Sequence, residues 1–199
     1  MPLVEYGVAK FVLPGQRESG DQHLVCCNQS GILVAAIDGI GHGEEAANAA
    51  QGAVAILKAG ADEPVISLLQ RCHQGLRATR GVVLSLAAID QEHGMMTWAG
   101  VGNVQGALMR AGAPNGSVQE VLLRGGVVGS QLPALQAAVL PVAKGDTLVF
   151  VTDGVHGDFA AGLSARESPQ RAADGILERH CRGNDDALVL VVRLTGVRA

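Results

Sequence analysis

Hydrophobic residues near the N-terminus follow the two-residue period of β-strands. Residues 3–12 and 22–28 indicate short strands on either side of the turn PGQRESGD, and the segment GILVAAID indicates a third strand that ends at Asp38. The third segment is apolar at almost every position, as is typical of a buried strand. The pattern therefore predicts three strands before any helix, with the third in a central position.

The apolar period changes to that of a helix at Glu44. Apolar side chains then recur along one helical face up to Gly60, which we expect to end the helix. Asp62 is placed to cap a second helix with Pro64 in its first turn, and a further apolar stripe continues through Leu76. Two consecutive amphipathic helices are therefore expected after the first three strands.

The rest of the chain returns to strand-like patterns, with one late helix. Ser168 and Pro169 form an N-cap and first-turn pair for this helix, which we expect to run to about Cys181. Turn-rich residues separate the strand-like segments, which are GVVLSLAAID, MMTWAGVG, VQGALMR, SVQEVLLR, QAAVLPV, DTLVFVTD and ALVLVVRL.

The order of these elements favours one class of architecture. Strands and helices do not alternate, so an open parallel sheet is disfavoured, and antiparallel sheets with helices packed on their outer faces are favoured. The length of 199 residues suits one core. We therefore expect an α+β fold in a single domain over residues 1–199, without a separate sensor domain.

Composition and charge disfavour several functional classes. Hydrophobic residues make up 48% of the chain and charged residues 17%, so a core can form and a disordered chain is excluded. The net charge of -4, without runs of Lys or Arg, argues against nucleic-acid binding. The N-terminus lacks a secretory signal pattern, and no apolar run approaches the roughly 18 residues of a membrane span. We expect a cytoplasmic protein with no membrane segment, and a monomer because no heptad pattern stands out.

Four aspartates lie at the edges of strongly apolar strands: Asp21, Asp38, Asp153 and Asp185. An isolated carboxylate in such a place loses solvation, which is unfavourable unless a partner compensates it. Carboxylates, a backbone carbonyl and water are the oxygen ligands that Mg²⁺ and Mn²⁺ prefer, whereas no His or Cys cluster suits Zn²⁺. Two of the acids precede a glycine, which lets the backbone approach a ligand closely. The alternative is that each acid is a turn residue, since Asp-Gly is a common turn dipeptide.

Five ordered motifs resemble a known enzyme family. They are DGIGHG with SGD before it, AGVGNV, RGGVVGSQLP, VTDGV and NDDALVLVV, and they cover about residues 19–193. Together they resemble the metal-dependent serine/threonine protein phosphatases of the PPM (protein phosphatase 2C-like) type. The likeness is to the compact bacterial branch that includes sporulation stage II E and the RsbX-type phosphatases of the stressosome. This resemblance implies a four-layer αββα sandwich, with two central antiparallel sheets, helices outside and metal ions at one end.

The resemblance also implies a site with two Mn²⁺ or Mg²⁺ ions. Asp38 would bridge the two ions, and the carbonyl of Gly39 would join the second. Asp153 and Asp185 would complete the shell of the first ion, and Asp21 would serve the second directly or through water. Asp38 and Asp153 are then the catalytic residues, at a site where the ions activate water for hydrolysis of phosphoserine or phosphothreonine.

Some residues near these motifs depart from the family pattern. In larger members a histidine follows the Asp-Gly pair directly, but here an isoleucine stands there and His42 comes two residues later. His42 remains a candidate for substrate contact or protonation, the alternative being a polar residue in the entrance turn of a helix. The guanidinium of Arg17 could bind phosphate, the alternative being a solvated charge. Asn103 is interpreted as a structural turn residue, and Asp186 ranks below Asp185 as a metal ligand.

Three functions follow from these patterns. The first is an Mn/Mg-dependent phosphoserine/phosphothreonine protein phosphatase that acts on STAS-domain stressosome proteins as a negative feedback regulator of stress signalling, with a substrate that rests on analogy. The second is a pseudophosphatase that binds a phosphorylated partner, and the retained acids count against it. The third is a hydrolase of small phosphoesters or nucleotides, against which the lack of a GxxxxGK[ST] phosphate loop counts.

Overall fold

The computed structural model describes residues 3–27, 29, 31–112, 118–160 and 166–196. These residues form three helices and ten strands. The helices are α1 (Glu44–Ala59), α2 (Val65–Gly75) and α3 (Pro169–His180). The strands are β1 (Val4–Phe11), β2 (Asp21–Cys27), β3 (Gly31–Gly39), β4 (Val82–Asp90), β5 (Met95–Val101), β6 (Gln105–Met109), β7 (Val118–Glu120), β8 (Ala138–Pro141), β9 (Thr147–Val151) and β10 (Ala187–Leu194).

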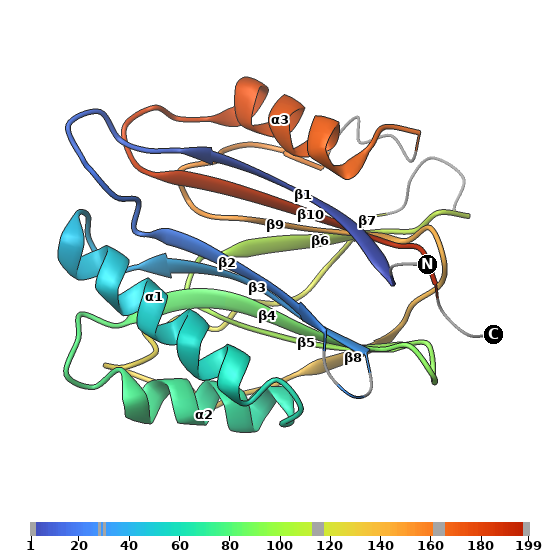
Figure 1. Cartoon of the computed structure of the whole chain (residues 1–199), viewed down its shortest axis with the longest axis horizontal. Helices are drawn as coiled ribbons and strands as arrows, with labels where there is room; N and C mark the ends of the chain where they lie inside the picture. The colour runs from blue at the N-terminus through green and yellow to red at the C-terminus, as the bar shows by residue number, and fades with distance from the viewer. Residues whose placement is uncertain (1–2, 28, 30, 113–117, 161–165, 197–199) are drawn as a thin grey trace.

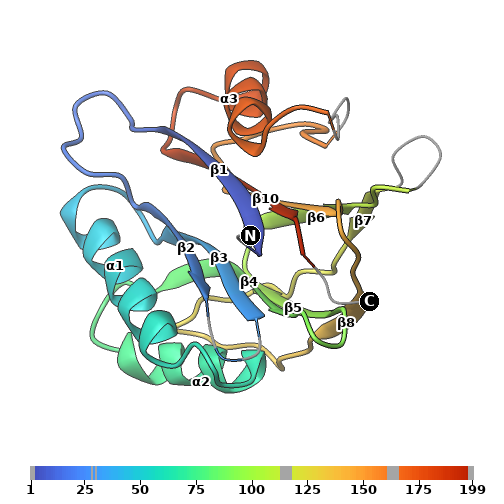
Figure 2. The ribbon, with the colours of Figure 1, turned by 45° about the vertical axis from the view of Figure 1, so that its right-hand side comes forward.

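The strands form two five-stranded antiparallel sheets that pack face to face. Sheet A has the order β1-β10-β9-β6-β7, and sheet B has the order β2-β3-β4-β5-β8. Helix α3 covers the outer face of sheet A, and α1 and α2 cover the outer face of sheet B (Figures 1 and 2). The expected αββα sandwich is confirmed. Within the described residues no helix is long and apolar enough to cross a membrane.

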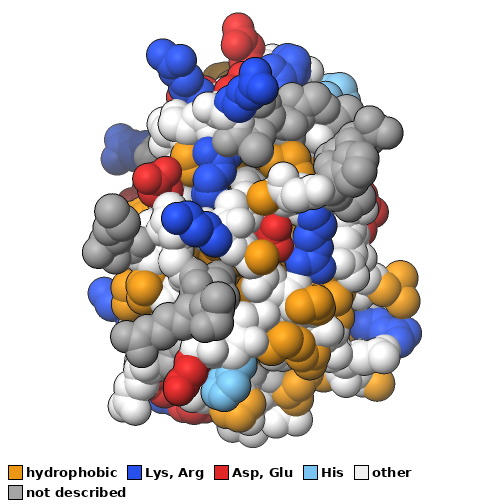
Figure 3. All heavy atoms as spheres, turned by 90° about the vertical axis from the view of Figure 1, so that its right-hand side faces the viewer, with side chains coloured by type: hydrophobic (Ala, Val, Ile, Leu, Met, Phe, Trp, Pro, Cys, Tyr) orange, Lys and Arg blue, Asp and Glu red, His pale blue; other side chains and the backbone are white. Residues whose placement is uncertain are grey.

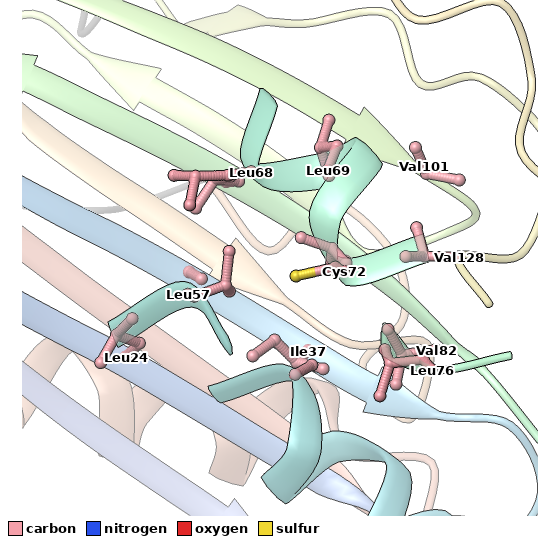
Figure 4. Close-up of a cluster of buried hydrophobic side chains, with 14 of the residues drawn as sticks. Leu24, Ile37, Leu57, Leu68, Leu69, Cys72, Leu76, Val82, Val101 and Val128 are labelled. Carbon is pink, nitrogen blue, oxygen red and sulfur yellow. The ribbon is translucent and has the colours of Figure 1, made fainter. Parts of the chain in front are cut away.

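Apolar side chains fill all three spaces between the four layers. Strand β3 explains the pattern: Leu33 and Ile37 point towards α1 and α2, while Ile32 and Val34 point between the sheets. Both faces of this strand are covered, which is why its sequence lacks polar alternation. Figure 4 shows the cluster between sheet B and its two helices. Between the sheets, Trp98 and Phe150 pack edge to face with centroids 5.3 Å apart.

Helix α3 begins as predicted, whereas α2 does not. The side chain of Ser168 accepts a hydrogen bond from the Arg171 amide, and a proline follows Ser168 directly. In α2 the N-cap is Pro64, with no side-chain capping bond. The prediction that Asp62 caps this helix is wrong because its Oδ1 instead accepts a hydrogen bond from the amide of Gln29, in the connection between β2 and β3.

Strand β7 is shorter than the segment SVQEVLLR predicts because the chain changes sheets there. After Glu120 it leaves β6 of sheet A and runs beside the end of β5 in sheet B, where Arg124 forms a parallel bridge with Val101. The amide of Gly102 donates to the Arg124 carbonyl at 2.8 Å. The segment that follows β7 therefore closes one side of the sandwich.

Candidate metal centre

Two of the predicted aspartates face each other on neighbouring strands of sheet B. The register of β2 and β3 pairs Asp21 with Asp38, at the end of the sandwich that lies on the left in Figure 1, away from both termini. Asp21 is 2% exposed, and its Oδ2 accepts a hydrogen bond from the Thr152 hydroxyl at 2.7 Å. Burial raises the pKa of Asp21 to about 7, although the Thr152 bond and the ammonium of Lys10 oppose the rise.

The pKa of Asp38 is raised further than that of Asp21. Burial is the main cause that raises its pKa to about 8, and four neighbouring carboxylates add to the rise. Those neighbours are Asp21, Asp153, Asp185 and Asp186. All four aspartates predicted from strand ends therefore converge in space, and the alternative of unrelated turn residues does not describe their arrangement.

A cavity of about 500 Å³ opens beside these carboxylates. Its walls come from the loops after β3, β5 and β9, from the start of β4, from the loop before β10, and from a Gly-Gly pair that follows β7. They are formed by Asp38, Ile40, Gly41, His42, Val83, Gly102, Asn103, Gly125, Gly126, Asp153 and Asp185. Asp21 is absent from these walls and is buried beside Asp38 on the neighbouring strand. Three of the five predicted ligands thus line the cavity, whereas Asp21 and Gly39 do not.

The glycines that follow Asp38 and Asp153 are required by close packing rather than by turn geometry. Neither Gly39 nor Gly154 has a positive φ. A Cβ on Gly39 would lie 2.1 Å from the carbonyl oxygen of Ala46 in α1, and a Cβ on Gly154 would lie 2.0 Å from the carbonyl oxygen of Asp186. The Asp-Gly pairs therefore admit neighbouring protein backbone, whereas the sequence suggested that they admit a ligand.

The side chains of Asp185 and Asp186 have different surroundings. Asp185 is exposed at the cavity, where its Oδ1 accepts the Asp186 amide. Asp186 is 5% exposed, and its two carboxylate oxygens accept the amides of Leu13 and Gly20 at 2.8 and 2.7 Å. Asp186 therefore fixes the loop between β1 and β2, and its backbone-bonded oxygens leave Asp185 as the acid available to a ligand.

Asn103 has a contact that the sequence did not predict. It was interpreted as a turn residue, but its Nδ2 donates to Oδ2 of Asp153 at 2.8 Å, and it lines the cavity. The bond fixes the orientation of the exposed Asp153 carboxylate. Thr152 is a second residue that the sequence analysis did not single out, and its hydroxyl donates a hydrogen bond to Asp21. Its signal in the sequence is a hydroxyl residue directly before the acid at the end of an apolar strand.

The two predicted substrate contacts occupy different places. His42 lines the cavity, and its Nδ1 lies 3.3 Å from Nε2 of Gln16. Arg17 does not reach this cavity and instead lines a separate polar one, of about 540 Å³, at the start of α1. The structure therefore brings His42, but not Arg17, to the aspartates.

The residues at the cavity fit a divalent cation. Among the described residues, no three His, Cys, Asp or Glu side chains are placed to hold a metal ion by themselves. Burial raises the pKa of Asp21 and of Asp38, and neighbouring carboxylates raise both further, while the ammonium of Lys10 opposes the rise at Asp21. A hard cation, bound by several of these oxygens together with water or a backbone carbonyl, would offset that repulsion.

Comparison with known proteins gives one family match and a curated relative. The sequence profile of the Stage II sporulation protein E (SpoIIE) family matches residues 28–195. The phosphoserine phosphatase RsbX of Bacillus subtilis (strain 168) is 23% identical over 182 residues, which cover 91% of this chain and 90% of that protein.

Solved structures show the same fold. One is described under "The bacterial stressosome: a modular system that has been adapted to control secondary messenger signaling"; it superposes with a TM-score of 0.86 at 30% identity, over 96% of this chain and 99% of that one. The structure of RsbX in complex with magnesium gives a TM-score of 0.85 at 22% identity, over 96% of each chain.

Proposed function

The chain belongs to the Stage II sporulation protein E (SpoIIE) family of PP2C-type protein phosphatases, and on that premise we propose that it dephosphorylates STAS-domain proteins of a stressosome. It would thereby act as a negative feedback regulator of stress signalling. The likeness to RsbX and to a structure described in connection with the stressosome supports this choice of substrate. The observation that carries the enzymatic part is the convergence of carboxylates at one open cavity.

The proposal includes two Mn²⁺ or Mg²⁺ ions held by the aspartates. Asp38 would contribute to both ions, and the Gly39 carbonyl would join the second. Asp153 and Asp185 would complete the shell of the first ion, and Asp21 would serve the second directly or through water. The magnesium in the RsbX structure favours this type of cation. When bound, such ions supply an activated water and neutralise charge on phosphoryl oxygens.

The residues of the chain would prepare the site for that chemistry. Asn103 would hold the Asp153 carboxylate in one orientation, and the Thr152 hydroxyl would do the same for Asp21. His42 stands at the cavity, where it would contact the substrate or carry a proton. Because the cavity is open, a phosphorylated side chain of a folded protein can enter it.

The test compares a protein substrate with a small one. Purified protein is incubated with a phosphorylated STAS-domain protein or with p-nitrophenyl phosphate, in Mn²⁺ or in EDTA. We expect phosphate release from the STAS-domain protein that requires the cation and is lost in Asp38→Ala and Asp153→Ala. Asp174→Ala is the matched control, since Asp174 is exposed on α3 and hydrogen-bonded to Gln170.

Each alternative function predicts a distinct result. Stable binding of the phosphoprotein without turnover would favour the pseudophosphatase. Faster turnover of free nucleotides than of the phosphoprotein would favour the hydrolase of small phosphoesters. Turnover of p-nitrophenyl phosphate with no preference for STAS-domain proteins would leave the phosphatase in place and refute the stressosome substrate.

A further inference from the structure

The side of the sandwich formed by β7 and β8 ends in two unpaired strand edges. Among the described residues, β7 is the last strand of sheet A and pairs with β6 alone, and β8 is the last strand of sheet B and pairs with β5 alone. A groove of about 230 Å³ lies between them, lined by residues 119–122 on one side and by 136, 137, 138 and 140 on the other. Free backbone N–H and C=O groups at such edges are suited to an extended polypeptide.

The groove carries one large apolar side chain that the fold leaves exposed within the described residues. Leu122 in this groove is 76% exposed, the highest value among the large exposed hydrophobic residues that the structure describes. Leu122 and Leu140 both line the groove. In Figure 3, which views the end of the sandwich where the termini lie, hydrophobic side chains gather in the lower right part of the face. An exposed leucine opposite a half-buried one can pack against an apolar side chain of a partner.

The groove continues into the candidate metal centre along a single stretch of chain. Leu122 belongs to the groove, whereas Gly125 and Gly126 belong to the walls of the metal cavity. Arg124 lies between them, held beside β5 by its backbone bridge. Its guanidinium donates to Oε1 of Gln136 on the opposite wall, and it has no carboxylate partner among the described residues. An exposed cation therefore lies between this groove, which combines apolar and polar side chains, and the acidic cavity.

We propose that the groove between β7 and β8 docks an extended segment of the protein substrate on one side of its phosphorylated residue. An apolar side chain of that segment packs against Leu122 and Leu140 while the phosphorylated side chain enters the metal cavity. An acidic group between the two faces Arg124. This inference rests on the proposed phosphatase function and adds a sequence preference to it.

The continuity of groove and cavity selects this occupant over a second copy of the chain. From Leu122 to Gly126 the chain advances four residues, so an extended segment beside it covers roughly 13 Å at about 3.3 Å per residue. A substrate in that position therefore carries its apolar residue about three or four places from the phosphorylated one. If a second copy of the chain occupied the groove, substrates would need no fixed spacing between an apolar residue and the phosphorylated residue.

Two synthetic phosphoserine peptides test the proposal. The first has leucine three and four positions from the phosphoserine on each side, with aspartate in the intervening positions, and the second has serine in place of every leucine. Phosphate release in Mn²⁺ is measured for the wild type, for Leu122→Ser and for Tyr6→Ser. Tyr6 is the matched control because it is 52% exposed on β1, at the opposite edge of sheet A.

The wild type and Tyr6→Ser should hydrolyse the leucine peptide with a kcat/KM about tenfold above that of the serine peptide, as expected for partial burial of a leucine side chain. In Leu122→Ser the two peptides should be hydrolysed with about equal kcat/KM, while p-nitrophenyl phosphate turnover stays at the wild-type rate. Equal rates for both peptides in the wild type, or a preference that survives Leu122→Ser, would overturn the proposal.

The failure of this inference differs from failure of the function on which it rests. If no peptide and no p-nitrophenyl phosphate is hydrolysed, the phosphatase function itself fails. If the peptides are hydrolysed without preference, only the docking groove fails. Light scattering of the same variants tests the competing occupant, because a dimer that dissociates in Leu122→Ser would assign the groove to a second copy of the chain.

Discussion

Replacing Asp38 by asparagine should stabilise the metal-free protein while it removes activity. In the folded state burial and neighbouring carboxylates raise the pKa of Asp38 to about 8, from 3.8 when unperturbed. The folded protein therefore holds a proton on Asp38 at pH values where the unfolded chain has lost it. Asparagine has nearly the same shape as the protonated acid and needs no proton, so the variant avoids this penalty.

The magnitude follows from the difference between the two pKa values. A folded pKa above the unfolded one gives stability that is complete below pH 3.8 and is lost as the pH rises to 8. At about 1.36 kcal/mol per pKa unit, the wild type loses roughly 2 kcal/mol by pH 5, 4 kcal/mol by pH 7 and 5 kcal/mol by pH 8. The advantage of Asp38→Asn over the wild type should grow with pH by these amounts.

Urea unfolding in EDTA measures the difference. Trp98 is the single tryptophan, is fully buried between the sheets, and reports unfolding by fluorescence. With a slope of about 2 kcal/mol per molar urea, a stabilisation of about 4 kcal/mol raises the midpoint by about 2 M at pH 7. Asp174→Asn, at an exposed position on α3, should stay within about 0.5 kcal/mol of the wild type at every pH.

Two results would refute this reasoning. One is an unchanged midpoint for Asp38→Asn at pH 7, which would mean that the carboxylates are well solvated or apart in solution. The other is an advantage that shrinks as the pH rises, which would mean that Asp38 is ionised and stabilised in the folded state. Saturating Mn²⁺ should narrow the gap, because cation binding stabilises the wild type more than the variant.

Three further changes have defined outcomes. Asn103→Ala should lower kcat by roughly 10- to 100-fold in Mn²⁺ with an unchanged unfolding midpoint, since it frees the exposed carboxylate of Asp153 from a positioning bond; wild-type kcat would exclude that role. Gly154→Ala should destabilise the protein by about 3 kcal/mol or more in urea, because its Cβ would lie 2.0 Å from a backbone oxygen, and a loss below about 1 kcal/mol would contradict this packing. Cys72 should resist thiol reagents at pH 8 in the native protein while the exposed Cys27 reacts, because burial raises the pKa of the Cys72 thiol to about 12; equal labelling rates would contradict this.

The sequence predicted the layers of the fold better than their details. The apolar run of β3 and the stripes of α1 and α2 follow directly from burial on one face or on two, so periodicity alone indicates them. The start of α2 could not be predicted, because the bond that draws Asp62 away comes from a residue more than thirty positions earlier. Local capping preference had no access to that contact.

The same limit applies to the candidate site. Acids at strand ends can be recognised along the chain, and the structure brings all four together. The pairing of Asn103 with Asp153 joins residues fifty positions apart, so turn chemistry was the only explanation that the sequence offered for Asn103. Arg17 was predicted to contact substrate because an arginine can bind phosphate, but it lines a separate cavity. Residue type and position in the sequence did not reveal which cavity it faces.

The hydrogen bonds of Asp186 to the loop between β1 and β2 affect when the site can form during synthesis of the chain. Its bond to the amide of Leu13 joins residues 173 positions apart, and β1 likewise pairs with β10. Contacts of such long range form late in folding. During synthesis on the ribosome, the aspartates of β2 and β3 emerge long before Asp186. The candidate metal centre therefore cannot assemble before Asp186 and β10 have left the exit tunnel.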